Sequence, residues 1–84
     1  MLLEDIFEDI IDYTLGPINS DVDYYRYYCY LLMMIKDIKV INRELCIALV
    51  YHLSYYIMND EDYALDVVSA FCKKYKNKKI NIKL

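Results

Sequence analysis

Glycine, proline and histidine are almost missing from this 84-residue sequence, which holds one of each and no tryptophan. A β-sheet protein of this length needs glycine or proline at most of its turns, so their scarcity argues against an all-β fold. A single glycine cannot build a glycine-rich phosphate loop. The one histidine, His52, offers no Ser–His–Asp or Cys–His spacing to assign. We therefore expect that the protein is not an enzyme.

Cysteines are also few, and their spacing is irregular. Cys29, Cys46 and Cys72 do not form the pattern of a disulfide framework or a zinc site. Each lies in an apolar stretch, so we expect all three to be reduced, buried and unreactive in an intracellular protein. The acids Glu4 and Glu8 could hold a metal, but an exposed acidic helix face is far commoner. The sequence thus predicts no metal site and no cofactor.

Targeting segments are not visible either. The N-terminus begins with acidic residues, whereas a secretory signal begins with basic residues followed by an apolar run. The longest apolar run, residues 27–35, is too short to cross a membrane. We expect neither secretion nor membrane association.

The chain is rich in hydrophobic residues. Hydrophobic residues make up 58% of it, which is enough to build a core and excludes a disordered chain. The length suits a single domain that spans residues 1–84. Eleven tyrosines are unusual. A codon bias of an AT-rich genome and a tyrosine-lined contact surface both explain them, and the two explanations are compatible.

Hydrophobic spacing predicts helices in the first half of the chain. Residues 2–14 place apolar side chains on one face and acids on the other, as an amphipathic helix does. Gly16 and Pro17 then end this helix. A second helix is capped by Ser20 or Asp21 and continues to Ile35. It is apolar nearly all round, so we expect it at the centre of the bundle.

The second half predicts two more long helices. Asn42 caps one that continues to Ile57, and Asn59 caps the next, whose first turn is acidic. Residues 80–84 form either a short last helix or an extended tail. Short loops make successive helices antiparallel neighbours, so the fold class is all-α, a compact antiparallel bundle of five to six helices. The core face of the last long helix is Ala64, Val67, Val68, Phe71 and Tyr75.

Charges are segregated along the sequence. Residues 1–23 carry seven acids and no lysine or arginine, whereas residues 73–84 carry six lysines and no acid, with a net charge of −3. Such patches orient a protein on a partner of opposite charge. Solvated faces that complement the helix dipoles are the alternative explanation. Lysines near the C-terminus could contact phosphates, but the acidic remainder repels nucleic acid, so we expect no nucleic-acid partner.

Several short motifs are similar to those of one family. Residues 41–43 read Ile-Asn-Arg and precede Leu45, which resembles an Ile-Pro-Arg-like step with asparagine in place of proline. Residues 23–32 resemble the second helix of that family, residues 63–67 the start of its fifth and residues 80–84 its short sixth. Residues 36–40 are too short for a full third helix. The family is the pyrin domain, a branch of the six-helix death fold, and the resemblance extends over nearly the whole chain.

The resemblance implies a death-fold-like bundle with a short or missing third helix that pairs with other pyrin domains through charged faces. A lone domain of this composition resembles the pyrin-only proteins of poxviruses. Those proteins bind a host inflammasome adaptor and block recruitment of the inflammatory caspase, and some also damp NF-kappa-B signalling. The implied location is the host cytoplasm, with the nucleus as an alternative. The implied contact residues are acidic Glu8, Asp9 and Asp12, and basic Arg26, Lys36, Lys39 and Arg43.

Other partners stay open. The chain could be another death-fold adaptor domain, such as a death-effector or caspase-recruitment domain. It could instead be a small helical subunit of a viral replication or transcription assembly, with its tyrosine-rich helix as an obligate interface. Self-association is a further alternative. All of these predict a host or viral protein as partner and no small-molecule substrate.

Overall fold

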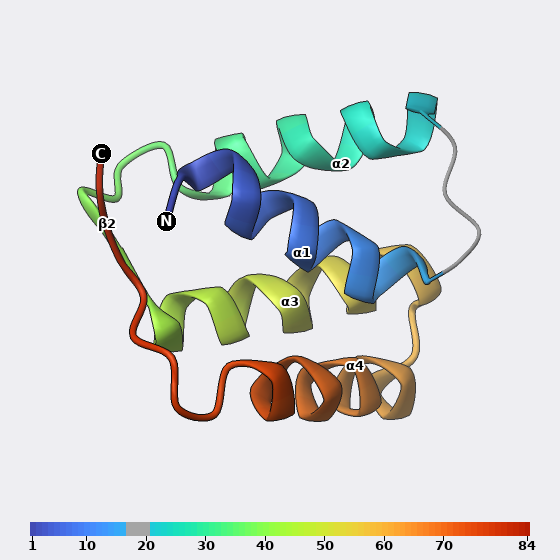
Figure 1. The fold of residues 1–84 in the computed structure, drawn as a ribbon. Coiled ribbons are helices and arrows are strands. Elements are labelled where there is room, and N and C mark those ends of the chain that lie inside the picture. The colour runs from blue at the N-terminus through green and yellow to red at the C-terminus, as the bar shows by residue number, and fades with distance from the viewer. Residues whose placement is uncertain (17–20) are drawn as a thin grey trace.

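The computed structural model describes residues 1–16 and 21–84, and its elements are mostly helical (Figure 1). This confirms the helical class, to which the structure adds a small sheet. Within the described residues there are four α-helices, fewer than the five or six expected. The helices are α1 (Leu3–Leu15), α2 (Asp21–Met34), α3 (Arg43–Met58) and α4 (Glu61–Lys74), and the strands are β1 (Val40–Asn42) and β2 (Asn81–Lys83).

Helix α1 is the amphipathic helix that the spacing predicts. Its buried face includes Ile6, Phe7 and Ile10, none of which is exposed to solvent. Gly16 ends the helix with a positive φ of 67°, and its backbone N–H donates to the carbonyl oxygen of Asp12. Glycine adopts that conformation without a steric cost. The expected roles of Pro17 and Ser20 lie outside the described residues.

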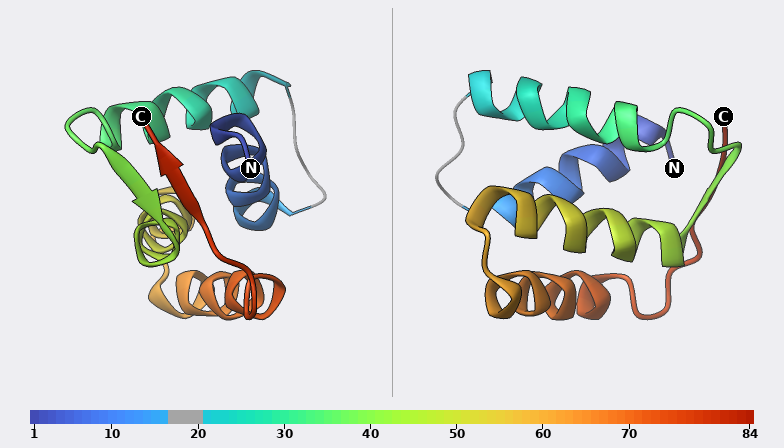
Figure 2. Two further views of the ribbon diagram at one scale, coloured as in Figure 1. Left: turned by 60° about the vertical axis from the view of Figure 1, so that its left-hand side comes forward. Right: turned by 180° about the vertical axis from the view of Figure 1, so that it is seen from behind.

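Helix α2 is not at the centre of the bundle, contrary to the expectation. Leu31 is its only buried residue, and Ile35 is buried just after its end. The tyrosines that make the helix appear apolar all round lie partly in solvent, because a tyrosine ring can pack while its hydroxyl stays in water. Figure 2 shows α2 along one side of the molecule, with α3 between it and α4.

Helix α3 occupies the central position instead, and it contacts α1, α2, α4 and β1. Its start is set by Asn42, whose side-chain oxygen accepts a hydrogen bond from the backbone N–H of Leu45 at 2.9 Å. The predicted cap is therefore confirmed. Leu49, Val50 and Leu53 line its buried face.

The turn between α3 and α4 differs from the prediction by one residue. Asn59 does not cap α4; it ends α3 in a left-handed conformation, with φ of 50°. Asp60 caps α4 by accepting hydrogen bonds from the N–H groups of Asp62 and Tyr63. The predicted core face is otherwise correct, with Ala64, Val67, Phe71 and Tyr75 buried and Val68 half-buried.

The two ends of the chain's second half meet in a small antiparallel sheet. Ile41 of β1 lies opposite Ile82 of β2, and both side chains are buried. Figure 2 shows the two strands side by side. Ile80 and Ile82 are buried while Asn81 and Lys83 are exposed, which is the alternation of a strand. Of the two predictions for residues 80–84, the extended one is thus correct. Residues 36–39 form a turn and not a helix.

Candidate protein-interaction surface

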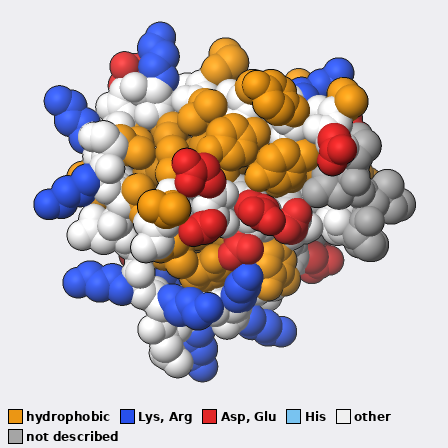
Figure 3. Space-filling view, turned by 45° about the horizontal axis from the view of Figure 1, so that its top comes forward, with side chains coloured by type: hydrophobic (Ala, Val, Ile, Leu, Met, Phe, Trp, Pro, Cys, Tyr) orange, Lys and Arg blue, Asp and Glu red, His pale blue; other side chains and the backbone are white. Residues whose placement is uncertain are grey.

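Acidic side chains form a line along α1. Glu4, Glu8 and Asp12 follow one another at intervals of four residues, so they lie on one helix face, and all three are exposed. We call these three residues the α1 acidic face. Figure 3 shows acidic side chains over α1, below the hydrophobic side chains over α2 and above a group of basic ones. Two of the three predicted acidic contact residues, Glu8 and Asp12, belong to this face.

Asp9, the third predicted residue, faces elsewhere. Its Oδ2 atom lies 2.9 Å from Nζ of Lys74 on α4 and also accepts a hydrogen bond from the hydroxyl of Tyr75. The hydrogen bond to Asp9 raises the pKa of Lys74. Asp9 therefore holds α1 against the end of α4 and is not part of the α1 acidic face.

Tyrosines of α2 border the α1 acidic face. The ring of Tyr28 packs edge-on against Phe7, with 5.2 Å between ring centroids. Burial raises the pKa of Tyr28, and the nearby Glu4 carboxylate raises it further. Burial likewise raises the pKa of Tyr24, with smaller contributions from Glu8 and other neighbours. The carboxylates thus lie next to aromatic rings, where a partner would meet both charge and apolar surface.

The predicted basic residues Arg26, Lys36 and Lys39 are exposed and Arg43 is half-buried, and the four do not form one face. Arg26 lies on α2, whereas Lys36 and Lys39 lie in the turn beyond its far end. Eight residues of helix, about 12 Å, separate Arg26 from Met34 at the end of α2, and Lys36 lies beyond that end. A basic face that combines all of the predicted residues is therefore absent from the described part of the chain.

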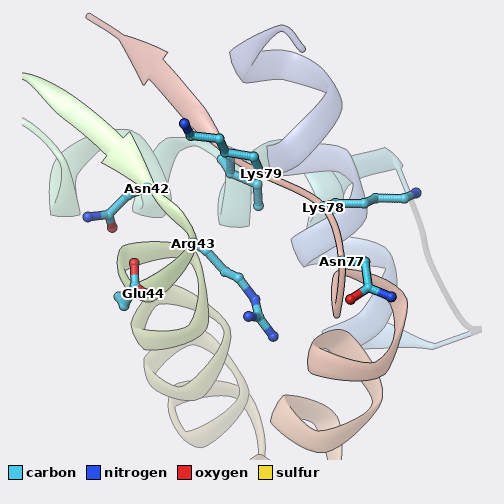
Figure 4. Close-up of a pocket in the computed structure, with 7 residues that line it drawn as sticks. Asn42, Arg43, Glu44, Asn77, Lys78 and Lys79 are labelled. Atoms are coloured by element: carbon cyan, nitrogen blue, oxygen red, sulfur yellow. The ribbon is translucent and has the colours of Figure 1, made fainter.

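Arg43 lies in a different environment, at the start of α3. It lines a hollow of about 380 Å³ together with Asn77, Lys78 and Lys79 from the segment after α4. Its Nε atom is buried and finds no hydrogen-bond partner among the described residues. In Figure 4 Arg43 extends toward the loop of Asn77, while Lys78 and Lys79 point in different directions. The cations surround the hollow without converging on one point in it.

An apolar stripe on α2 is the feature that sequence reasoning missed. The side chains of this stripe are exposed to solvent. One of them belongs to a cysteine, so the expectation of three buried cysteines is wrong. Cys29 is exposed and Cys72 is half-buried, so only Cys46 is buried as predicted. The signal was present in the spacing of three and four residues, which the overall apolar character of the helix obscured. We call the following residues the α2 apolar stripe: Val22, Tyr25, Cys29, Leu32 and Met33.

No helix in residues 1–16 and 21–84 is long and apolar enough to cross a membrane. Across those ranges, no group of three or more His, Cys, Asp or Glu side chains is placed to hold a metal ion. Comparisons with protein families, with curated proteins and with solved structures find no match to this chain.

Proposed function

We propose that this chain is a non-enzymatic protein-interaction domain that binds the pyrin domain of a host inflammasome adaptor through the α1 acidic face. The observation that carries the proposal is the line of exposed carboxylates at Glu4, Glu8 and Asp12 beside the half-buried rings of Tyr24 and Tyr28. Complementary charge steers two proteins together, and partly buried aromatic rings supply contact area at the same place.

The segment after α2 favours the pyrin family over the other death-fold families for this chain, and thus a pyrin domain as its partner. Residues 36–39 form a turn where a full third helix would stand in a death-effector or caspase-recruitment domain. Strand β2 is a departure, because the resemblance implies a short sixth helix over residues 80–84. That strand pairs with β1, and neither strand contributes a residue to the α1 acidic face.

The expected consequence of binding is termination of a growing assembly. A head-to-tail polymer grows only when each subunit offers two complementary faces. Here the acidic face is continuous, whereas Arg26 lies about 12 Å along α2 from the end of that helix, and Lys36 lies beyond that end. A chain with one working face would occupy the adaptor and add nothing for the next subunit. It would thereby block inflammasome assembly, activation of the inflammatory caspase and, as in some pyrin-only proteins, NF-kappa-B signalling.

The test is binding of the purified chain to the purified pyrin domain of the adaptor. Glu8→Lys and the double variant Glu8→Lys/Asp12→Lys reverse charge on the face. Asp9 is left unchanged, because its loss would disturb the α1–α4 contact. In the single variant, lysine at position 8 lies four residues from Glu4 and from Asp12, so it does not weaken α1; the double variant places two lysines four residues apart, so circular dichroism must show that its helices are retained. Asp66→Lys, at an exposed position on α4, is the matched charge control.

We expect the chain to bind and to slow adaptor filament growth at substoichiometric amounts. The double variant should lose at least about tenfold in affinity, since each contact across an interface of this kind contributes roughly 1 kcal/mol. Asp66→Lys should bind like the unaltered chain. Absence of binding at high micromolar concentration would end the adaptor proposal, and seeding of filaments by the chain would end the termination mechanism.

The second candidate function is that of a subunit of a viral replication or transcription assembly. The hollow beside Arg43, which basic residues surround, favours this function. Arg43, Lys78 and Lys79 surround that hollow, and Lys73 and Lys76 are exposed nearby in sequence. A labelled single-stranded oligonucleotide is the probe, and binding that weakens steeply with salt and with Lys78→Glu/Lys79→Glu would support this function. If the chain does not bind the oligonucleotide at low salt, this second function is excluded.

A further inference from the structure

The α2 apolar stripe leaves large hydrophobic side chains in water. Val22 and Met33 are each 75% exposed, Tyr25 is 73% exposed and Leu32 is 41% exposed. Single exposed hydrophobic residues are ordinary, but a contiguous apolar patch on a monomer marks an interaction site. Figure 3 shows hydrophobic side chains gathered over α2. The stripe lies on the solvent side of the helix, opposite the buried Leu31.

The spacing along the stripe is that of a helix-pairing seam. Val22, Tyr25, Cys29 and Leu32 are separated by three, four and three residues, as are the apolar positions of a heptad. Met33 lies beside Leu32 and widens the seam at one end. The helix has 14 residues and is about 21 Å long, so its partner is an element of similar length. An α-helix with the same seam meets this requirement.

Charge at the two ends of α2 selects the direction of such a pair. Asp21 begins the helix, and Lys36 and Lys39 follow its end and outnumber Asp37. Two parallel copies would place like charges together, whereas two antiparallel copies place Asp21 of one within about one turn of Lys36 of the other. Antiparallel helix dipoles also attract each other. A second copy of α2 thus complements the first in both apolar spacing and charge.

We infer that the α2 apolar stripe is the interface of a symmetric homodimer, in which the α2 helices of two copies of this chain pack antiparallel. Val22 then faces Leu32 of the second copy, and Tyr25 faces Cys29 of the second copy. The same contacts recur on the other side of the two-fold axis, as in any isologous interface. This interface is separate from the α1 acidic face, so it does not rest on the proposed function.

The dimer is weak and concentration-dependent. Two helices of this length bury less than the roughly 1,200–2,000 Å² of a stable complex, so the dissociation constant should be on the order of 10–100 µM. Analytical ultracentrifugation of the whole chain over a range of concentrations measures it. Cys29→Glu brings carboxylates close to the two-fold axis and should raise the dissociation constant at least tenfold. Leu65→Glu, at a 50% exposed apolar position on α4, is the matched control and should leave it unchanged.

Disulfide trapping tests the antiparallel direction. The background is Cys29→Ser/Cys72→Ser, since Cys46 is buried and burial raises the pKa of its thiol to about 11. In that background Val22→Cys/Leu32→Cys should give a covalent dimer with a mild oxidant, because the two positions face each other between copies. Val22→Cys alone should not, since its thiols would lie about 15 Å apart along the pair.

Three results would overturn the inference. The chain could stay monomeric at several hundred micromolar, or dimerise equally well with Cys29→Glu, or crosslink through Val22→Cys alone as a parallel pair would. Circular dichroism of each variant confirms that the helices are retained. The adaptor experiment has a separate outcome. If Glu8→Lys/Asp12→Lys loses adaptor binding but still dimerises, the two surfaces bind different partners.

Discussion

Asp9 and Lys74 are 65 positions apart in the chain, and their charged groups meet at 2.9 Å between Oδ2 and Nζ. The hydroxyl of Tyr75 donates to the same carboxylate oxygen. Lys74 is substantially exposed, so its ion pair contributes less than about 1 kcal/mol to the free energy of unfolding. Tyr75 is 2% exposed, so its hydroxyl has little access to water. The hydrogen bond from Tyr75 should therefore matter more than the ion pair.

Substitutions of Asp9, Tyr75 and Lys74 should lower the free energy of unfolding, with the largest effect at Asp9 and the smallest at Lys74. Asp9→Ala removes the acceptor for both donors and should lower the free energy of unfolding by about 1–2 kcal/mol. Tyr75→Phe should cost about 1 kcal/mol, and Lys74→Met less than either. Urea denaturation measures all three. Glu8→Ala, one residue away on the exposed face, is the control and should change the free energy by only a few tenths of a kcal/mol. An equal cost for Glu8→Ala and Asp9→Ala would contradict this assignment.

Alkaline pH should destabilise the fold. Burial, followed by the hydrogen bond to Asp9, raises the pKa of Tyr75 well above its ordinary value of 10.0. The same carboxylate raises the pKa of Lys74 above 10.5. The folded chain therefore retains protons that the unfolded chain releases. Its stabilisation is complete below the ordinary pKa values and is lost as the pH rises through the higher folded values.

Denaturation in urea at about pH 8 and about pH 10.5 tests this direction. The midpoint should be lower at the higher pH. Tyr75→Phe removes one of the responsible groups, so the difference between the two midpoints should shrink in that variant. A midpoint that is constant or rises with pH would show that the hydroxyl of Tyr75 is not held in its protonated form by the fold.

The turn between α3 and α4 makes a prediction about two adjacent residues. Asp60→Ala removes the oxygen that accepts from the N–H groups of Asp62 and Tyr63 and should cost about 1 kcal/mol. Asn59 has a left-handed backbone, so Asn59→Gly should be neutral or stabilising, whereas Asn59→Ala should cost about 1 kcal/mol. Thermal denaturation, monitored by circular dichroism, distinguishes the three variants. A cost for Asn59→Gly as large as that for Asp60→Ala would place the cap at Asn59.

The helices could be predicted because their signals are local. Asn42 caps α3 through the N–H of a residue three positions away, and the apolar spacing of α1 repeats every turn. The same kind of reasoning failed for α2, because composition counts tyrosine as apolar while the folded chain leaves much of it in water. The last residues were ambiguous because three alternating positions are too few to separate a strand from a helix end.

The candidate site was only partly predictable, for a physical reason that Asp9 illustrates. Glu8 and Asp9 are adjacent acids on one amphipathic helix, and nothing nearby in the sequence distinguishes them. Their difference arises from Lys74 and Tyr75, which only the fold brings to Asp9. The exposed stripe on α2 was missed for a related reason. Whether an apolar residue faces the core or solvent depends on which neighbours cover it, and spacing alone leaves the two faces equivalent.

Ser54 on the buried face of α3 provides the last prediction. Its side chain is fully buried, and its Oγ atom finds no hydrogen-bond partner among the described residues. A buried hydroxyl without a partner is destabilising, because it has lost its hydrogen bonds to water. Ser54→Ala should therefore raise the free energy of unfolding by about 1–2 kcal/mol, which for a domain of this size is roughly 4–8 °C in Tm per kcal/mol.

Part of that gain would come from the helix itself, since alanine is the better helix former by about 0.5 kcal/mol. Ser69→Ala on α4 isolates this part, because Ser69 is an exposed serine in a helix interior. The prediction is that Ser54→Ala stabilises the fold more than Ser69→Ala does, as measured by urea denaturation of both variants. If Ser54→Ala instead stabilises less, or destabilises, the hydroxyl of Ser54 is hydrogen-bonded in solution and α3 depends on it.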